Sequence, residues 1–207
     1  LMLVHVLGNS TNMKSLMKVL ERNKIYLIED TCESLGSKYK NKYLGTFGSF
    51  SSFSFYSSHQ ISSGEGGMIT CKTLEDYEIL KALRSHGWSR GLKDENKISR
   101  ENKNLDSRFI FYNSGFNLRP TDVSAAIGIS QFKDMDKLIK LRNHNREFIV
   151  KSFKQNSIIN SNFDFIERNK HVEPSWFGIP ILIKNKKNRN KFISKIEKKG
   201  VETRPII

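Results

Sequence analysis

Two polar positions near strand-like segments are the first candidates for chemistry. Asp30 follows an apolar run typical of a buried parallel strand. An acidic side chain just beyond such a strand points into the crevice where α/β folds bind ligands. There, a carboxylate can keep a pyridinium nitrogen protonated, which makes the ring an electron sink. The alternative is an ordinary aspartate that caps the next helix.

The second candidate is Ser54, which lies in the hydroxyl-rich stretch Phe53–Ser58, ahead of the glycines of Gly64–Met68. Small residues let backbone N–H groups approach an anion closely. We therefore expect Ser54 to bind a phosphate group. The alternative is a Ser/Gly-rich turn between two strands, since a Gly-rich loop alone has low specificity.

The elements that position these residues follow a strand–helix–strand order, which is typical of a mostly parallel α/β sheet with flanking helices. Apolar runs predict four strands and helical spacing predicts two helices, at the following ranges: strands Leu1–Leu7, Ile25–Ile28, Phe50–Tyr56 and Met68–Cys71, and helices Met13–Leu20 and Leu74–Leu83.

The second half of the chain is predicted to contain fewer strands. A long helical region begins at Thr121 or Asp122 and breaks near residues 133–134. The other expected segments are an exposed loop at Gly91–Asp106, a polar linker at Asn156–Lys170, a strand at Trp176–Ile183 and a basic helix at Asn188–Lys199. We place a domain boundary at residue 150, with a large domain in 1–150 and part of a small α+β domain in 151–207.

Composition bounds the class of protein. The chain has 207 residues, 37% hydrophobic and 27% charged, which fits a folded domain. No apolar stretch approaches the roughly 18 residues of a membrane span. Two cysteines are too few for a disulfide framework and fit a reducing, cytoplasmic setting. The net charge of +14 indicates either an anionic partner such as nucleic acid or a lysine-rich solvated surface.

The two ends of the chain lead us to expect a fragment. Leu1 opens directly into an apolar run, and Arg204–Ile207 stops without a terminating feature.

Seven segments together resemble the DegT/DnrJ/EryC1/StrS family of sugar aminotransferases, which have the fold type I of pyridoxal-phosphate (PLP) enzymes. The match follows the chain in order at Ile28–Gly36, Gly45–Gly48, Phe53–Tyr56, Gly64–Met68, Gly115–Asp122, Ala125–Gly128 and Val201–Pro205. The resemblance implies that residues 1–150 are the C-terminal part of the large PLP-binding domain. Residues 151–207 would then begin a truncated small domain.

The resemblance also implies roles for individual residues. Asp30 would bind the pyridine nitrogen, Glu33 would lie near the ring hydroxyl, and Ser54 would bind the phosphate. Asn117 would reach the phosphate bound to the neighbouring subunit, because this family builds each site across a homodimer. The upstream phosphate-binding segment of the family is absent from the chain.

His59 departs from the family pattern, which has lysine at this position. No lysine occurs between Lys42 and Lys72, so no register shift restores one. Lysine binds the cofactor covalently and carries protons during transamination. Histidine cannot form that bond, but it can move protons near neutral pH. An inactive relative is one interpretation.

The other interpretation is a change of reaction. Ser58–Ser62 and Arg84–Arg90 resemble the branch of the family that removes the C3 hydroxyl of a nucleotide-linked 4-keto sugar, expected to be GDP-linked, in deoxysugar and O-antigen lipopolysaccharide synthesis. A second kind of dehydratase binds an iron–sulfur cluster through several cysteines. Residues 86–120 contain no cysteine, which excludes that kind, and we expect no metal.

The implied mechanism uses pyridoxamine phosphate held without a covalent link, with glutamate as amino donor. His59 would remove a proton from the C4′ carbon of the cofactor while the C3 hydroxyl leaves, and would protonate the leaving oxygen. Without a lysine, the route to an aminosugar is disfavoured.

Three further residues are candidates. His86 is either catalytic or a structural histidine after a helix, and Trp88 either lines the substrate entrance or anchors a loop. Arg204 lies in a block that the family places near the substrate.

Three hypotheses for the whole protein follow: a sugar 3-dehydratase, a true aminotransferase or inactive relative, and a basic nucleic-acid-binding module. Only net charge supports the last, so we expect neither a nucleic-acid nor a membrane partner.

Overall fold

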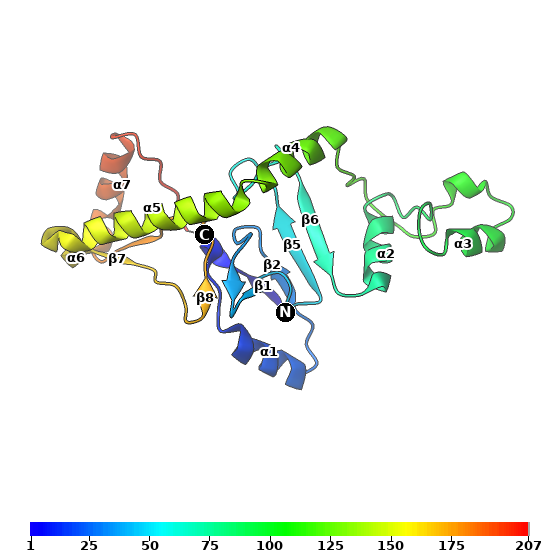
Figure 1. Ribbon diagram of the computed structural model, residues 1–207, viewed down its shortest axis with the longest axis horizontal. Coiled ribbons are helices and arrows are strands. Elements are labelled where there is room, and N and C mark those ends of the chain that lie inside the picture. The colour runs from blue at the N-terminus through cyan, green and yellow to red at the C-terminus, as the bar shows by residue number, and fades with distance from the viewer. Residues whose placement is uncertain (207) are drawn as a thin grey trace.

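The computed structural model describes residues 1–206, apart from the side chains of residues 158 and 186. Its centre is a four-stranded sheet in the order β1-β2-β5-β6 (Figure 1). The strands β1 (Met2–Val4), β2 (Ile28–Asp30) and β5 (Phe50–Ser54) are parallel, and β6 (Gly67–Cys71) is antiparallel to β5. The mostly parallel sheet confirms the prediction.

Helix α1 (Met13–Arg22) joins the first two strands. It begins after Asn12, whose side chain accepts a hydrogen bond from the Ser15 N–H at 3.1 Å and so satisfies a free donor of the first turn. Its apolar face contributes to the main core of the molecule, which consists of the buried residues Met13, Leu20, Leu27, Tyr39, Leu44 and Val172. Burial of this face, rather than helix propensity, stabilises so short a helix.

A small second sheet lies beside the first and was not predicted. It has the order β4-β3-β8, with β3 (Lys38–Tyr39), β4 (Lys42–Tyr43) and β8 (Val172–Glu173). Two-residue strands are too short to show the alternation that reveals a strand in a sequence. Because Val172 belongs to the main core, this sheet holds the C-terminal part of the chain against the N-terminal part.

The first two helices after the central sheet differ in how well the sequence predicted them. α2 (Leu74–Leu83) occupies the predicted range. The predicted exposed loop at Gly91–Asp106 is wrong in part, because α3 (Glu95–Glu101) lies within it, followed by the 3₁₀ turn η2 (Ser107–Phe109). No residue of α3 is buried, so this helix carries no apolar period that the sequence could reveal.

The long helical region divides as predicted. α4 (Asp122–Phe132) is capped by the Thr121 side chain, and α5 (Met135–Gln155) follows the break at residues 133–134. α5 carries the chain away from the central sheet toward α6, β7 and α7 (Figure 1). The boundary at residue 150 falls within α5 and stays a prediction.

The predicted polar linker at Asn156–Lys170 is wrong. α6 (Ser157–Asn162) and β7 (Phe163–Phe165) occupy its first half, and β7 pairs with β9 (Ile181–Ile183). Phe163 and Phe165 each contact Phe153 of α5, so long-range aromatic packing orders the segment. The 3₁₀ turn η3 (Lys186–Asn188) and α7 (Arg189–Glu197) end this part of the chain.

The predicted strand Trp176–Ile183 is correct only over β9. The preceding residues form an irregular segment, 174–178, whose structural role is described below. No helix of the described residues is long and apolar enough to cross a membrane.

Candidate active site

The carboxyl ends of neighbouring parallel strands bring two predicted site residues to one edge of the sheet. Asp30 ends β2 and pairs in register with Ser52 of β5, two residues before Ser54 at the end of β5. Both side chains are half-buried. In α/β proteins this edge is where ligands bind.

The Asp30 carboxylate has no helix to cap, because residues 31–37 form turns that lead to β3. The helix-capping alternative is therefore wrong. Asp30 Oδ1 instead accepts a hydrogen bond from the Cys32 N–H at 3.0 Å. Burial, and next the neighbouring Asp30 carboxylate, raise the pKa of the Cys32 thiol to about 11. The thiol next to Asp30 is thus uncharged at neutral pH.

The loop between β5 and β6 carries Ser54 and His59. Ser54 Oγ accepts a hydrogen bond from the Tyr56 N–H at 3.2 Å, which turns the chain at the end of β5. The Phe55 N–H donates to the Gly66 carbonyl and the Ser63 N–H donates to the Phe55 carbonyl, at 2.9 Å each. These two hydrogen bonds close the loop. The loop has serine hydroxyls and a histidine but no lysine.

His59 lies between two aromatic rings. The centroid of its ring is 5.9 Å from that of Tyr56 and 5.2 Å from that of Phe177, both edge to face. His59 Nδ1 is buried and has no hydrogen-bond partner, whereas Nε2 is not among the buried unpaired atoms of the described residues. Nε2 is therefore the ring nitrogen available to a ligand.

Glu33 is held by the fold itself. Its Oε2 accepts a hydrogen bond from the Leu7 N–H at 2.8 Å. The main-chain carbonyl of Glu33 accepts another hydrogen bond from Gln60 Nε2 at 2.5 Å. Glu33 thus connects the turn after β1 with the His59 loop, and its predicted place near a ring hydroxyl stays a prediction.

The other predicted residues lie on different segments. The His86 N–H donates to the Phe116 carbonyl at 2.8 Å, and Ser85 forms a backbone bridge with Asn117. Trp88 Nε1 donates to the Arg108 carbonyl at 2.8 Å, and the Trp88 ring stacks with Phe109 and Phe111.

These contacts join residues 85–88 to residues 108–117. Among the hydrogen bonds and ring contacts of the described residues, none joins His86, Asn117 or Arg204 to Asp30, Ser54 or His59. The structure places Asp30 and Ser54 at the ends of neighbouring strands and His59 in the loop that follows Ser54, and the roles of all the candidates stay predictions.

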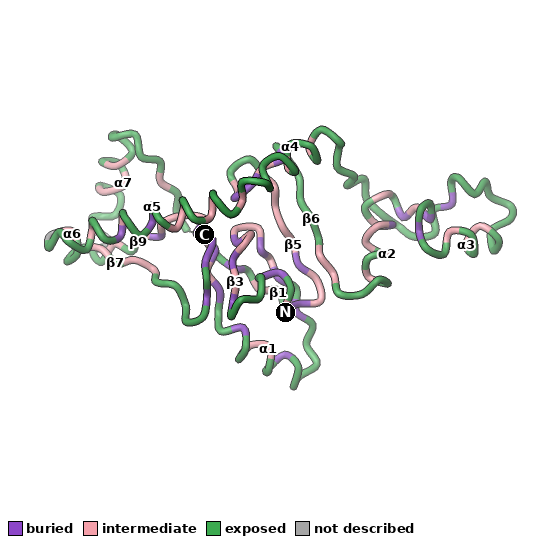
Figure 2. Tube along the Cα trace, in the orientation of Figure 1, coloured by how far each residue is buried: buried purple, intermediate pink, exposed green. Residues whose placement is uncertain are grey.

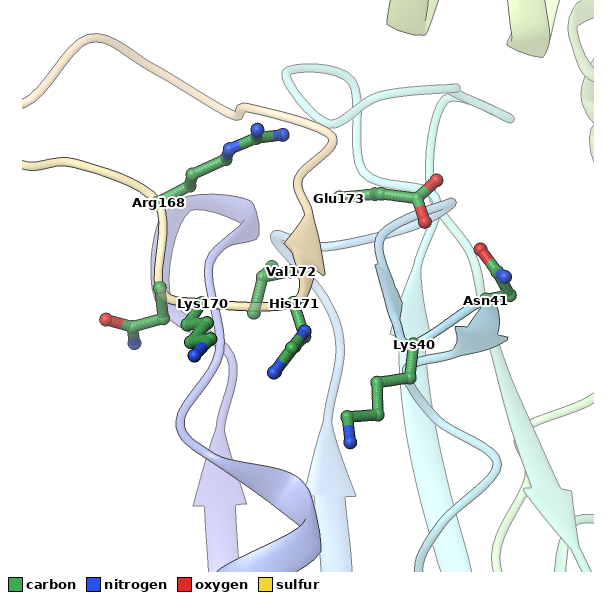
Figure 3. A pocket seen from close by; sticks show the side chains of 8 residues that line it. Lys40, Asn41, Arg168, Lys170, His171, Val172 and Glu173 are labelled. Atoms are coloured by element: carbon green, nitrogen blue, oxygen red, sulfur yellow. The ribbon is translucent and has the colours of Figure 1, made fainter.

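A cavity of about 600 Å³ lies elsewhere, between the β3–β4 hairpin and residues 168–173 (Figure 3). Three of its side chains are basic, namely Lys40, Arg168 and Lys170. His171 and the acidic Glu173 also line it. Loss of water contact, and next the charges of Lys40 and Lys170, lower the pKa of His171. None of the predicted site residues lines this cavity.

Two residues that contact the site were missed in the sequence. Phe177 packs on His59, and Gln60 donates to the carbonyls of Glu33 and, at 3.4 Å, Ser175. Gly178 and Pro180 next to Phe177 are signals against a continuous strand and for an irregular segment there. Within the described residues, no group of three or more His, Cys, Asp or Glu side chains is placed to hold a metal ion.

The fold and the arrangement of these residues define an α/β protein with a candidate ligand site at the carboxyl edge of its sheet. The chain belongs to the DegT/DnrJ/EryC1/StrS aminotransferase family, whose sequence model matches residues 1–207.

Two curated relatives differ in the reactions that their names describe. The chain is 35% identical over 208 residues to a GDP-4-keto-6-deoxy-D-mannose 3-dehydratase of Escherichia coli, covering 99% of this chain and 52% of the relative. It is 32% identical over 206 residues to a GDP-perosamine synthase of Escherichia coli, covering 100% of this chain and 51% of that protein. The chain thus spans about half the length of the curated relatives it matches.

A solved structure confirms the fold. The Escherichia coli GDP-4-keto-6-deoxy-D-mannose 3-dehydratase, described with bound hydrated PLP, has a TM-score of 0.86 to this chain at 36% identity. The match covers 99% of this chain and 52% of that structure. The predicted fold class, that of PLP-dependent aminotransferases, is therefore correct.

Proposed function

We propose that the protein is a PLP- and pyridoxamine-phosphate-dependent 3-dehydratase that removes the C3 hydroxyl of a GDP-linked 4-keto-6-deoxy sugar. The single observation that carries this proposal is His59 in the loop between Ser54 and β6, where no lysine is present. The similarity to a 3-dehydratase over 99% of the chain supports it.

The residues at the sheet edge fit the cofactor. Asp30, half-buried at the end of β2, would bind the pyridine nitrogen and keep it protonated. Ser54 and the N–H groups of its turn would bind the phosphate. His59 Nδ1 is a buried polar atom without a partner, while Nε2 is not among the buried unpaired atoms of the described residues.

When bound, pyridoxamine phosphate supplies an amine for the 4-keto group and a ring that takes up electrons. His59 Nε2 takes up a proton and returns it to the oxygen that leaves C3, which is general base and then general acid catalysis by one imidazole. Because no lysine competes at this position, the reaction is directed to deoxygenation rather than to an aminosugar. Glutamate would be the amino donor for the bound cofactor.

We further propose a cytoplasmic homodimer that acts in deoxysugar and O-antigen synthesis. Large apolar side chains are exposed around Asn117, which favours burial against a second subunit: Phe109, Phe111, Phe116, Leu118 and Val123. Cys32 and Cys71 are free thiols, which fits a reducing compartment.

Mass spectrometry of the sugar nucleotide tests the reaction. The full-length gene product is incubated with PLP, glutamate and GDP-4-keto-6-deoxymannose. A product that has lost one oxygen and gained no nitrogen supports the dehydratase. A product with a new amine supports the second candidate, an aminotransferase, which the similarity to GDP-perosamine synthase favours.

A matched pair of variants tests His59. We expect His59→Asn to lower kcat by about 10²–10⁴-fold, because it removes the acid–base group. His144→Asn, at an exposed position of α5, is the control and should leave kcat unchanged. Near-normal turnover of His59→Asn excludes the proposed role.

A further inference from the structure

The segment 174–178 reaches the candidate site from the far end of the chain and contacts His59 directly. Phe177 is half-buried, and its ring meets His59 edge to face at an interplanar angle of 83°. The Tyr56 ring also meets the imidazole edge to face, at 80°. A ring held between two aromatic side chains has fewer accessible rotamers than one in solvent.

Phe177 is itself held firmly. Its N–H donates to the Leu7 carbonyl at 3.1 Å, which ties it to the turn after β1. Arg142 Nε donates to the Trp176 carbonyl at 2.8 Å, and Arg142 Nη2 donates to the Phe177 carbonyl. The Arg142 guanidinium also lies 5.8 Å from the centre of the Phe177 ring.

Two neighbours of Arg142 on α5 hold the same segment. Asn143 Nδ2 donates to the Pro174 carbonyl at 2.9 Å. The Arg146 guanidinium lies 4.0 Å from the centre of the Trp176 ring. One face of α5 therefore fixes the backbone at Phe177 and on its N-terminal side.

Burial makes the Arg142 contacts strong. Loss of water contact lowers the pKa of Arg142, although an arginine stays charged at neutral pH. Hydrogen bonds from a charged, desolvated donor to two successive carbonyls are stronger than neutral ones. The planar fork of a guanidinium matches this pair of acceptors, whereas a lysine ammonium does not.

We propose that Phe177 is a positioning residue for His59 and that Arg142 holds Phe177 in place. The contact holds the His59 imidazole with Nδ1 buried, which leaves Nε2 as the ring nitrogen available to a ligand. The kinetic consequence of this proposal rests on the proposed function, whereas the contact between Phe177 and His59 does not depend on it. A small misplacement of a catalytic group can cost up to about 10²-fold in rate.

Kinetics of the full-length protein give the first test. We expect Phe177→Leu to lower kcat at least about tenfold with a nearly unchanged KM for the sugar nucleotide, because the proton-transferring group is misplaced while substrate binding remains. Phe177→Tyr retains the ring and should restore most of kcat. Arg142→Lys should give an intermediate loss.

Phe165→Leu is the matched control. Phe165 makes a similar edge-to-face contact with Phe153, at 5.4 Å and 85°, in the part of the fold that holds β7. The control reports what losing an aromatic contact does to stability alone, and its kcat should stay near that of the unmodified protein. Equal losses of kcat in Phe177→Leu and Phe165→Leu would show a merely structural role.

Nuclear magnetic resonance of histidine-labelled protein without cofactor separates this proposal from the proposed function. The His59 ring signal, assigned by its absence in His59→Asn, should shift in Phe177→Leu and Arg142→Lys but not in Phe165→Leu. An unmoved His59 signal overturns the proposal whatever reaction the enzyme performs. A moved signal without dehydratase activity would reject the proposed function and retain the contact.

Discussion

At the scale of single residues, Glu29 shows how a buried hydrogen-bond network stabilises the strand that carries Asp30. It lies beside Asp30 and is fully buried. Its carboxylate lies 2.9 Å from His5 Nε2 and accepts hydrogen bonds from the N–H groups of Gly45, Phe47 and Gly48 at 2.7–2.8 Å. Burial acts to raise the pKa of Glu29, but the hydrogen bonds from His5, Gly48 and Gly45 outweigh it, so the pKa is lowered.

This network predicts a pH-dependent stability. Because the pKa of Glu29 is lower in the folded protein, its contribution is complete above its unfolded pKa, near 4.5, and is lost as the pH falls through the folded pKa. We expect Glu29→Gln to destabilise the protein by about 3 kcal/mol at pH 7, since it breaks a buried charged network. Urea unfolding between pH 7 and pH 3 measures both effects.

The exposed Glu65 provides the control for this prediction, because Glu65→Gln changes the same charge without a buried partner. Parallel curves of stability against pH for the unmodified protein and Glu29→Gln would contradict the assignment.

At the scale of elements, a close approach between two segments joins the halves of the molecule. Gly8 has φ +88°, and a Cβ there would lie 2.2 Å from the Ser175 carbonyl oxygen. Ser37 bridges the same two segments, because its hydroxyl donates to the Gly8 carbonyl at 2.8 Å and accepts from the Ser175 N–H at 2.8 Å. Only glycine fits this position, which sets where Phe177 lies.

Two glycine substitutions separate the cost of backbone strain from the cost of the close approach at Gly8. Gly64 also has positive φ, at +83°, but a Cβ there would meet no described atom within 4 Å. We expect Gly64→Ala to cost about 1–2 kcal/mol for backbone strain alone. Gly8→Ala should cost clearly more, because backbone atoms must also move. Thermal unfolding of the full-length variants compares them, and equal costs would show that the close approach is not rigid.

At the scale of the whole molecule, the chain exposes far more surface than a compact protein. Its accessible surface is 14604 Å², whereas a monomer of 23.9 kDa exposes about 9,900 Å². Figure 2 shows buried residues gathered around β1, β2 and β5, with α3 and α4 largely exposed. Val123, Ile129 and Phe132 of α4 are among the exposed apolar side chains.

This surface predicts the behaviour of the 207-residue polypeptide by itself. We expect it to bind the dye ANS and to self-associate, because exposed apolar area of this extent is buried when a partner is present. The net charge of +14 opposes association at low salt, so added salt should promote it through screening. Sedimentation at two salt concentrations measures the effect, with the full-length protein as control. A salt-independent monomer without ANS fluorescence would contradict the prediction.

The sequence by itself determined the family, the mostly parallel sheet and the candidates Asp30, Ser54 and His59. For Asp30 and Ser54 the reason is local, because each ends a strand visible in the sequence and neighbouring parallel strands end at one edge. The family and His59 followed from the resemblance of motifs along the chain. The same locality made α2 and the break between α4 and α5 predictable, since helical spacing and a side-chain cap are short-range signals.

Only the tertiary structure decided which surroundings these residues receive. The contact of Phe177 with His59, the hold of Arg142 on Phe177 and the pairing of β3 with β8 join segments far apart in the chain. The short strands and the irregular segment 174–178 carry no periodic pattern, because they are ordered by long-range packing and hydrogen bonds rather than by their own sequence. The orientation of the His59 imidazole therefore depends on how distant parts of the chain pack together.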